Sequence, residues 1–140
     1  MINGGVARWR AGLQWLSATL LAILFISFDM EMMPMQYVQP LFRPPSEAES
    51  LILQVTLGCS HNRCTFCSMY RTKRFQTRPL KQVEADIRES RALMGAGVRR
   101  VFLADGDAMC LSTRRLLDLL APINAAFPAL QRVSAYANAR

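Results

Sequence analysis

Three cysteines within nine residues carry the side-chain types and spacing in this sequence that could do chemistry. The stretch "CSHNRCTFC" (residues 59–67, the cysteine loop) has C-x4-C-x2-C spacing, and a fourth cysteine, Cys110, follows later. Thiolates are nucleophiles, redox groups and ligands for soft metals. The loop is therefore predicted to bind a metal, form a disulfide or carry out thiol chemistry.

Two purely thiol-based uses explain the pattern less well than a metal centre does. A disulfide framework is typical of small, loop-rich domains in oxidising compartments, and an alternation of strands and helices needs no such cross-links. A thioredoxin-like pair of Cys64 and Cys67 would use a helix start to lower a thiol pKa. That pair leaves Cys59 without a role, so both alternatives rank below metal binding.

Zinc and iron–sulfur clusters are the metal centres to compare. A tetrahedral zinc site would take Cys59, Cys64 and Cys67 together with His61 or Cys110. No second pair of ligands accompanies them, and His61 is so close to Cys59 that the loop would have to fold back. We therefore interpret His61 as a loop histidine bonding to nearby backbone. An iron–sulfur cluster is favoured, because it uses thiolates and one loop can surround it from one side.

The type of cluster depends on the role of Cys110. The spacing followed by a later cysteine is also that of plant-type [2Fe–2S] ferredoxins, where Cys110 would be the fourth ligand. Those electron carriers are typically acidic, with small residues in the loop, whereas this loop is basic and contains Phe66. Cys110 is more simply a small apolar residue between a turn and a helix. Three thiolates on a [4Fe–4S] cluster leave one iron open to a cofactor or substrate, and we favour this prediction.

The surrounding sequence predicts alternating strands and helices that would position the loop. The expected elements are a strand at 51–58, a helix at 78–97, a strand at 98–107, a helix capped by Ser112 and a strand at 130–139. The first strand is nearly all apolar, as expected for a strand buried on both faces. The apolar residues of the second helix are Leu116, Leu117, Leu120 and Ile123.

This order predicts an α/β fold with parallel strands. Short links between strands and helices favour right-handed crossovers that bring successive strands into one sheet. In such folds the chemistry lies beyond the carboxyl ends of the strands. The cysteine loop follows the first strand and "ADGD" (residues 104–107) follows the second. We expect them to meet at the same edge of the sheet.

Together these features resemble the radical S-adenosylmethionine superfamily. The resemblance rests on "LILQVTLGCSHNRCTFC", on Phe66 before the last cysteine and on "FLADGDA" at the end of the second strand, and it covers about residues 50 to 139. It implies a partial TIM-like barrel of parallel βα units. This sequence would supply about two and a half units, truncated after about the third strand, as a partial core domain over residues 50–140.

The resemblance also implies an enzyme that cleaves S-adenosylmethionine reductively to make a radical, which takes a hydrogen atom from a substrate. Its cofactors would be a [4Fe–4S] cluster and S-adenosylmethionine, and its electron donor a protein such as flavodoxin or ferredoxin. The implied cluster ligands are Cys59, Cys64 and Cys67. Phe66 would lie near the adenine, and Gly106 and Asp107 resemble the Gly-Gly-Glu element whose carboxylate meets the methionyl ammonium. No residue of the sequence specifies the substrate.

Two departures from the family pattern shape these expectations. Four residues, 60–63, separate the first two cysteines where three are commonest, and the extra residue is expected to bulge. The resemblance also implies later strands that contact the ribose and the methionyl carboxylate, and we expect this sequence not to supply them. We therefore expect the chain to bind a cluster without efficient turnover, with a non-functional truncated fragment as the alternative.

The net charge of +7 is unevenly distributed. Between Ser50 and Val83 there are no acidic residues and six basic ones, namely Arg63, Arg71, Lys73, Arg74, Arg78 and Lys81. We interpret this stretch as a solvated basic surface. Nucleic-acid binding is not expected, because stacking aromatics are sparse there.

The first 49 residues differ from the rest. Residues 1–32 form an apolar extension, in which 12 of the 17 residues from 12 to 28 are apolar. A helix of that length rises about 25 Å, slightly short of a hydrocarbon core. The alternatives are a membrane anchor, a signal peptide or a mis-called start near Met30. Residues 33–49 are an irregular, proline-containing lead-in. The expected location is cytoplasmic, with a membrane tether only through residues 12–28.

Overall fold

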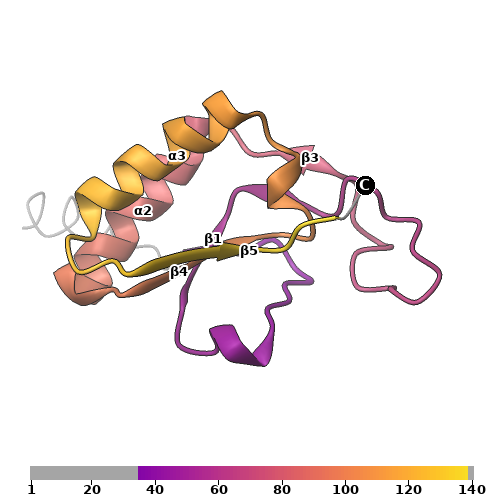
Figure 1. Cartoon of the computed structure of the whole chain (residues 1–140), viewed down its shortest axis with the longest axis horizontal. Helices are drawn as coiled ribbons and strands as arrows, with labels where there is room; N and C mark the ends of the chain where they lie inside the picture. The colour runs from indigo at the N-terminus through magenta and orange to yellow at the C-terminus, as the bar shows by residue number, and fades with distance from the viewer. Residues whose placement is uncertain (1–34, 139–140) are drawn as a thin grey trace, which may run out of the picture. The chain divides into compact units, whose positions relative to one another are not determined.

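A computed structural model of the chain describes residues 35–138, which form a mixed α/β unit (Figure 1). The strands are β1 (Leu51–Gln54), β2 (Thr56–Leu57), β3 (Gln76–Thr77), β4 (Arg100–Ala104) and β5 (Arg132–Ala135). The helices are α2 (Leu80–Met94) and α3 (Thr113–Ala126), with 3₁₀ turns η1 (Pro45–Glu47), η2 (Gly95–Gly97) and η3 (Ala108–Cys110). The apolar extension at 1–32 lies outside the described residues.

The main sheet has three parallel strands in the order β1-β4-β5, which confirms the predicted parallel α/β arrangement. Leu51 pairs with Val101, and Val101 pairs with Val133 on the other side. All four residues of β1 are buried, as the apolar run predicted. Since the strands are parallel, their carboxyl ends lie at one edge of the sheet.

The predicted strand at 51–58 is wrong in one respect, because it divides at Val55. The Val55 N–H donates to the Ala104 carbonyl over 2.6 Å, while its own carbonyl accepts from the Arg78 N–H over 3.1 Å. Thr56 and Leu57 then turn away as β2 and pair antiparallel with β3. The segment between β2 and β3 contains the cysteine loop, so a two-stranded hairpin closes its base.

Helix α2 confirms the core of the prediction at 78–97. Its buried residues, Val83, Ile87 and Ser90, recur at three- and four-residue spacing along one face. The helix begins after Pro79 and ends at Gly95, whose φ of 70° is in the left-handed region that glycine adopts readily. The last residues of the predicted range form the turn η2 instead.

Helix α3 confirms the predicted cap and corrects the predicted face. The Ser112 hydroxyl accepts a hydrogen bond from the Arg115 N–H over 3.3 Å. Leu117, expected on the apolar face, is 61% exposed, whereas Leu119 is buried with Ile123. The face that packs on the sheet is therefore the one through Leu119 and Ile123, four residues apart.

The two faces of the sheet are covered differently, as Figure 1 shows. Helices α2 and α3 cover one face in a cluster that includes Leu53, Leu103, Ile87 and Ile123. On the other face, Ile52, Phe102 and Ala104 pack against Tyr37, Leu41 and Tyr136. The described part of the lead-in thus belongs to the same compact unit as the sheet, with Met35 packed on the helix side and Tyr37 and Leu41 on the opposite face.

The described helices are short. Within residues 35–138, no helix is both long enough and apolar enough to cross a bilayer. The segment at 12–28, which carries the alternative of a membrane anchor, is outside this range.

Candidate functional site

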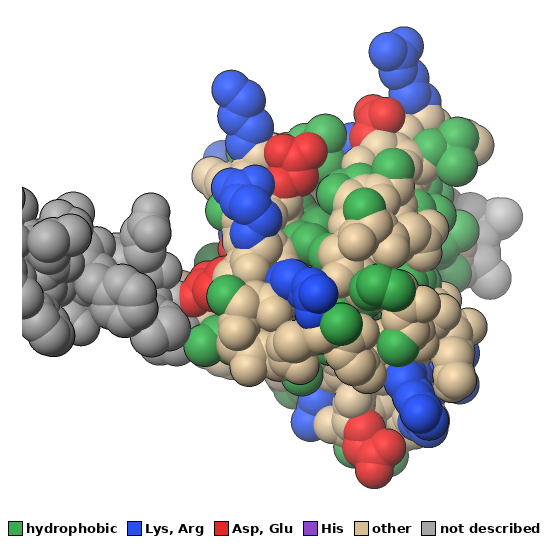
Figure 2. Space-filling view, turned by 90° about the vertical axis from the view of Figure 1, so that its left-hand side faces the viewer, with side chains coloured by type: hydrophobic (Ala, Val, Ile, Leu, Met, Phe, Trp, Pro, Cys, Tyr) green, Lys and Arg blue, Asp and Glu red, His purple; other side chains and the backbone are tan. Residues whose placement is uncertain are grey.

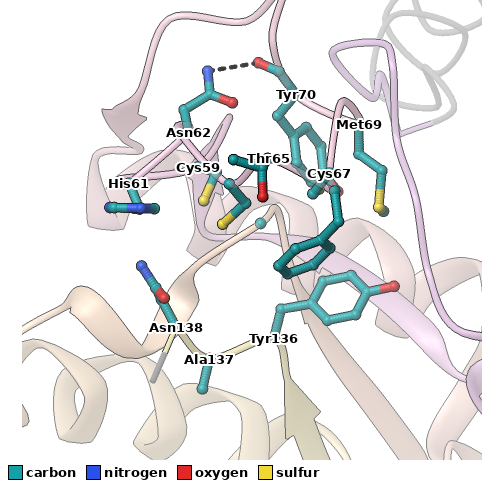
Figure 3. Close-up of a pocket in the computed structure, with 13 residues that line it drawn as sticks. Cys59, His61, Asn62, Thr65, Cys67, Met69, Tyr70, Tyr136, Ala137 and Asn138 are labelled. Carbon is teal, nitrogen blue, oxygen red and sulfur yellow. Dashed lines mark hydrogen bonds between the residues drawn. The ribbon is translucent and has the colours of Figure 1, made fainter. Parts of the chain in front are cut away.

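A pocket of about 710 Å³ opens at the carboxyl ends of the parallel strands (Figure 3). It gathers five of the six predicted site residues from two separate parts of the chain: the three loop cysteines, Phe66 and Gly106. The other lining residues are His61, Asn62, Thr65, Met69, Tyr70, Tyr136, Ala137 and Asn138. The expected meeting of the cysteine loop with the end of the second strand is therefore found.

Hydrogen bonds to the backbone fix the shape of the cysteine loop. The Arg71 guanidinium donates to the carbonyls of Cys64 and Cys67, over 2.6 and 3.3 Å. The Asn62 amide donates to the Tyr70 carbonyl over 2.9 Å, drawn as a dashed line in Figure 3. All four cysteines are free thiols. The loop is thus shaped by its own polar side chains, and its thiols remain available as ligands.

The described residues hold no site for a single metal ion. Among residues 35–138, no three His, Cys, Asp or Glu side chains are arranged to share one ion. A cubane cluster makes a different demand, because each cysteine binds a different iron and the three thiols need only face a common space.

Cys110 does not join the other three cysteines. It lies in η3, is exposed, and is not part of the pocket wall. Desolvation of its sulfur raises the pKa of the Cys110 thiol, and the negative charge of Asp107 raises it further. Cys110 thus lies outside the pocket wall that the other three cysteines share.

Gly106 allows the end of β4 to approach the cysteine loop closely. Its N–H donates to the Gly58 carbonyl over 3.0 Å. A Cβ atom at this position would lie 2.7 Å from Tyr70 Cδ2 and 2.9 Å from Cys59 Cβ, which is too close for either contact. Only glycine fits here without moving the first cysteine or the tyrosine.

Asp107 is buried beside the pocket and connects three segments. One carboxylate oxygen accepts from the Ser60 hydroxyl next to Cys59, and the other accepts from the Asn138 N–H over 3.3 Å. The side chain is not part of the pocket wall. The carboxylate thus holds the cysteine loop and the end of β5 together.

Behind the pocket lies a buried ion pair that the sequence interpretation missed. Lys73 Nζ donates to Asp105 Oδ2 over 2.6 Å, and also to the carbonyls of Val38 and Pro40 over 2.6 and 2.9 Å. Three acceptors satisfy the three N–H donors of the ammonium. Lys73 therefore attaches the lead-in to the end of β4.

Asp105 itself connects the strand ends to the cysteine loop. Its carboxylate accepts from the Gly58 N–H over 2.8 Å and from the Gln54 amide over 3.0 Å. Its N–H donates to the Thr56 hydroxyl over 3.1 Å. The residue before Cys59 is thus fixed by a fully buried carboxylate. The available signal was an aspartate directly after a buried strand, where a charge needs a partner.

The basic stretch at 63–81 is not uniformly solvated, which corrects that interpretation. Lys73 is buried, and Arg78 forms a 2.5 Å ion pair with Asp86 while donating to the Gln54 carbonyl. Figure 2 shows Lys and Arg side chains scattered singly over one face, with Asp and Glu among them. Lys73 and Arg78 therefore use their positive charge in ion pairs within the fold and not on a solvated surface.

Aromatic side chains form one wall of the pocket. Phe66 is 92% exposed, although it lines the pocket. Tyr136, just after β5, packs edge-to-face on Phe102 with 5.2 Å between ring centroids. Desolvation raises the pKa of Tyr136, and the negative charge of Cys67 raises it further. Phe66 thus offers an uncovered ring to a ligand, while Tyr136 is fixed by the sheet.

Comparison of the chain with protein-family models, with curated proteins and with solved structures found no match.

Proposed function

We propose that the described unit is part of a radical S-adenosylmethionine core domain. In this proposal Cys59, Cys64 and Cys67 hold a [4Fe–4S] cluster, and S-adenosylmethionine binds beside it in the same pocket. The observation that carries the proposal is the convergence of three free thiols and Gly106 on one pocket beyond the ends of parallel strands. The three-stranded sheet would be the first part of a TIM-like barrel.

The residues present fit a cluster with three protein ligands. The thiols come from one loop, face one pocket and have no disulfide partner. The fourth cysteine is outside the pocket wall, which supports a set of three protein ligands. Such a set leaves one iron available to a small molecule, which an electron carrier with four cysteines does not.

The pocket also suits a small molecule with a planar base. The chemistry supplied by the bound cluster would be one-electron reductive cleavage of S-adenosylmethionine, as the resemblance implies. Phe66 offers an exposed ring on which adenine can pack. Gly106 lets the end of β4 lie against Cys59 and Tyr70, so the strand end and the first cysteine share one pocket wall. Arg71 holds the loop carbonyls so that the thiols keep their relative positions.

The wider activity follows from the same proposal. Transfer of one electron to the cluster requires a reduced protein donor such as flavodoxin or ferredoxin. Tyr136 and Asn138, which line the pocket, follow the edge strand β5, where further strands of a barrel would add. Those strands would supply the contacts that choose the substrate.

Anaerobic reconstitution of the purified chain with iron and sulfide tests the proposal. The expected result is about four irons per chain and the absorption and electron paramagnetic resonance spectra of a [4Fe–4S] cluster. A variant with Cys59, Cys64 and Cys67 all replaced by alanine should lose both. Retention of the same iron content and absorbance in that variant would overturn the assignment.

Cys110→Ser is the matched control, because it removes a thiol that lies outside the pocket wall. The [4Fe–4S] spectrum should survive this change unaltered. If Cys110→Ser instead abolished a [2Fe–2S] spectrum, the chain would be a small electron carrier.

A further inference from the structure

A side-chain amide in the pocket lacks a hydrogen-bond partner. Among residues 35–138, two buried side-chain polar atoms have none: Nδ2 of Asn138 and Oε1 of Glu89. Glu89 is on α2 and does not line the pocket, whereas Asn138 does. Buried donors in folded proteins are nearly always paired. The Asn138 nitrogen therefore marks a place where a bound molecule can supply an acceptor.

The surrounding contacts fix the position of Asn138. Its backbone N–H donates to Asp107, whose second oxygen is held by Ser60 of the cysteine loop. Two residues earlier, Tyr136 packs on Phe102. Figure 3 shows the Asn138 amide directed toward the side of the pocket where His61 and the loop lie. The donor is thus held in place by groups that do not satisfy it.

We propose that Asn138 binds the ligand of this pocket by donating from Nδ2 to an oxygen of S-adenosylmethionine, and that Asp107 positions Asn138. The inference rests on the proposed function. It also assigns Asp107 a different task from the ammonium contact that the resemblance implies, because its carboxylate binds Ser60 and the Asn138 backbone and lies outside the pocket wall.

The acceptor is a carboxylate or hydroxyl oxygen. No Lys, Arg, Asp or Glu is among the described residues that line the pocket, so a neutral amide is the donor on this side. S-adenosylmethionine offers the methionyl carboxylate and the ribose hydroxyls. A carboxylate is the stronger acceptor for a buried amide, and we expect it to be the partner.

Calorimetric titration of the anaerobically reconstituted full chain tests this assignment. The probes are S-adenosylhomocysteine and 5′-deoxy-5′-methylthioadenosine, which lacks the amino-acid part. Asn138→Ala should weaken S-adenosylhomocysteine binding about tenfold and leave the methylthioadenosine affinity unchanged. Equal losses for both probes would place the acceptor on the ribose and still support the donor role. Asn124→Ala, on an exposed position of α3, is the matched control.

The remaining outcomes overturn the inference in distinguishable ways. Unchanged affinity of Asn138→Ala for both probes would overturn it and leave the proposed function standing. If Asn138→Ala failed to take up iron, the Asn138 side chain would be needed for the fold and not for ligand binding, which would overturn the inference. The backbone hydrogen bond to Asp107 does not depend on this side chain, so its loss would not explain such a result. A wild-type chain that takes up its iron but binds neither probe would overturn the proposed function and, with it, the inference. Asn138→Asp is a second test, because it keeps the side-chain shape but replaces the amide donor with a negative charge. The aspartate would repel the carboxylate of S-adenosylhomocysteine, so binding should weaken more than in Asn138→Ala.

Discussion

Lys73 and Asp105 form an ion pair behind the cysteine pocket, with 2.6 Å between Nζ and Oδ2 and side-chain exposures of 7% and 0%. Lys73 comes from the segment between β2 and β3, and Asp105 follows β4 directly. Because the ammonium also binds two lead-in carbonyls, the pair joins three segments that are distant in sequence. Because Asp105 also accepts from the Gly58 N–H, these contacts fix the backbone at the start of the cysteine loop.

Removal of one partner of this pair should destabilise the fold strongly. Lys73→Met leaves the buried Asp105 carboxylate without a counter-charge, and breaking such a pair typically costs about 3–5 kcal/mol. Urea denaturation followed by circular dichroism would measure the loss in the free energy of unfolding. Glu49→Gln is the control, because it removes an exposed pair with Arg100 at 3.9 Å and should cost less than about 1 kcal/mol. Equal effects of the two substitutions would contradict the structural role of Lys73.

Gly106→Ala should disturb the pocket directly. The new Cβ would meet Tyr70 and Cys59 below 3.0 Å, so the tyrosine ring or the first cysteine must move. We expect a loss of about 1–3 kcal/mol in the free energy of unfolding and a lower iron content after reconstitution. Gly97→Ala is the matched control, since a Cβ there meets nothing within 4 Å. An iron content for Gly106→Ala equal to that of this control would disprove the steric argument.

Arg71→Ala should loosen the cysteine loop with little effect on the fold. Arg71 is exposed, yet its guanidinium binds the carbonyls of Cys64 and Cys67. We expect iron to be lost to a chelator several times faster than in the wild type, while the free energy of unfolding changes by less than about 1 kcal/mol. Arg74→Ala removes an equal charge from an exposed neighbour and should retain the wild-type rate. The time course of iron release decides the question.

Glu47 predicts a pH dependence of stability. The hydrogen bond from Ser50 lowers the pKa of Glu47 below its ordinary value of 4.5, and Arg132 of β5 contributes to the same shift. A lowered folded-state pKa means that the carboxylate stabilises the fold above pH 4.5 and that this contribution is lost as the pH falls through the folded pKa. Glu47→Gln should therefore melt at a lower temperature than the wild type at neutral pH.

The difference between the two proteins should shrink in acid. Thermal melts recorded from neutral pH down to about pH 3 would show the curves converging, because the protonated wild-type side chain no longer attracts Arg132. Glu49→Gln, at an exposed neighbouring position, controls for the loss of one surface carboxylate. A constant difference between wild type and Glu47→Gln across the range would rule out this linkage.

The sequence predicted the elements well where local signals decide them. Ser112 and Gly95 mark helix ends through capping chemistry that acts within a few residues. The strand prediction failed at Val55, where the strand divides so that Thr56 and Leu57 can pair with β3. β3 lies about twenty residues further on, and no local signal in the sequence marks it as the partner. The packing face of α3 was also misjudged, since several leucines offer more than one apolar stripe and the sheet selects Leu119.

The candidate site was predictable from residue type and topology but not in its connections. The cysteines and Gly106 were expected together because parallel strands end at one edge. The acceptors of Lys73 could not be read from composition, because a lysine in a basic stretch is usually solvated and only the fold brings Asp105 to it. Asn138 is not part of any recognisable sequence motif. Only the structure shows that its Nδ2 atom is buried without a hydrogen-bond partner.

The two oxygens of Asp107 have a consequence for cooperativity. One holds Ser60 beside the first cysteine, and the other holds the backbone that carries Asn138. Thermodynamic linkage is reciprocal. If metal binding to the cysteine loop raises the affinity for a ligand at Asn138 by some factor, that ligand must raise the affinity of the loop for metal by the same factor. Metal loading and ligand affinity would then rise together through a single carboxylate, and Asp107→Asn, with a weaker acceptor, would separate them.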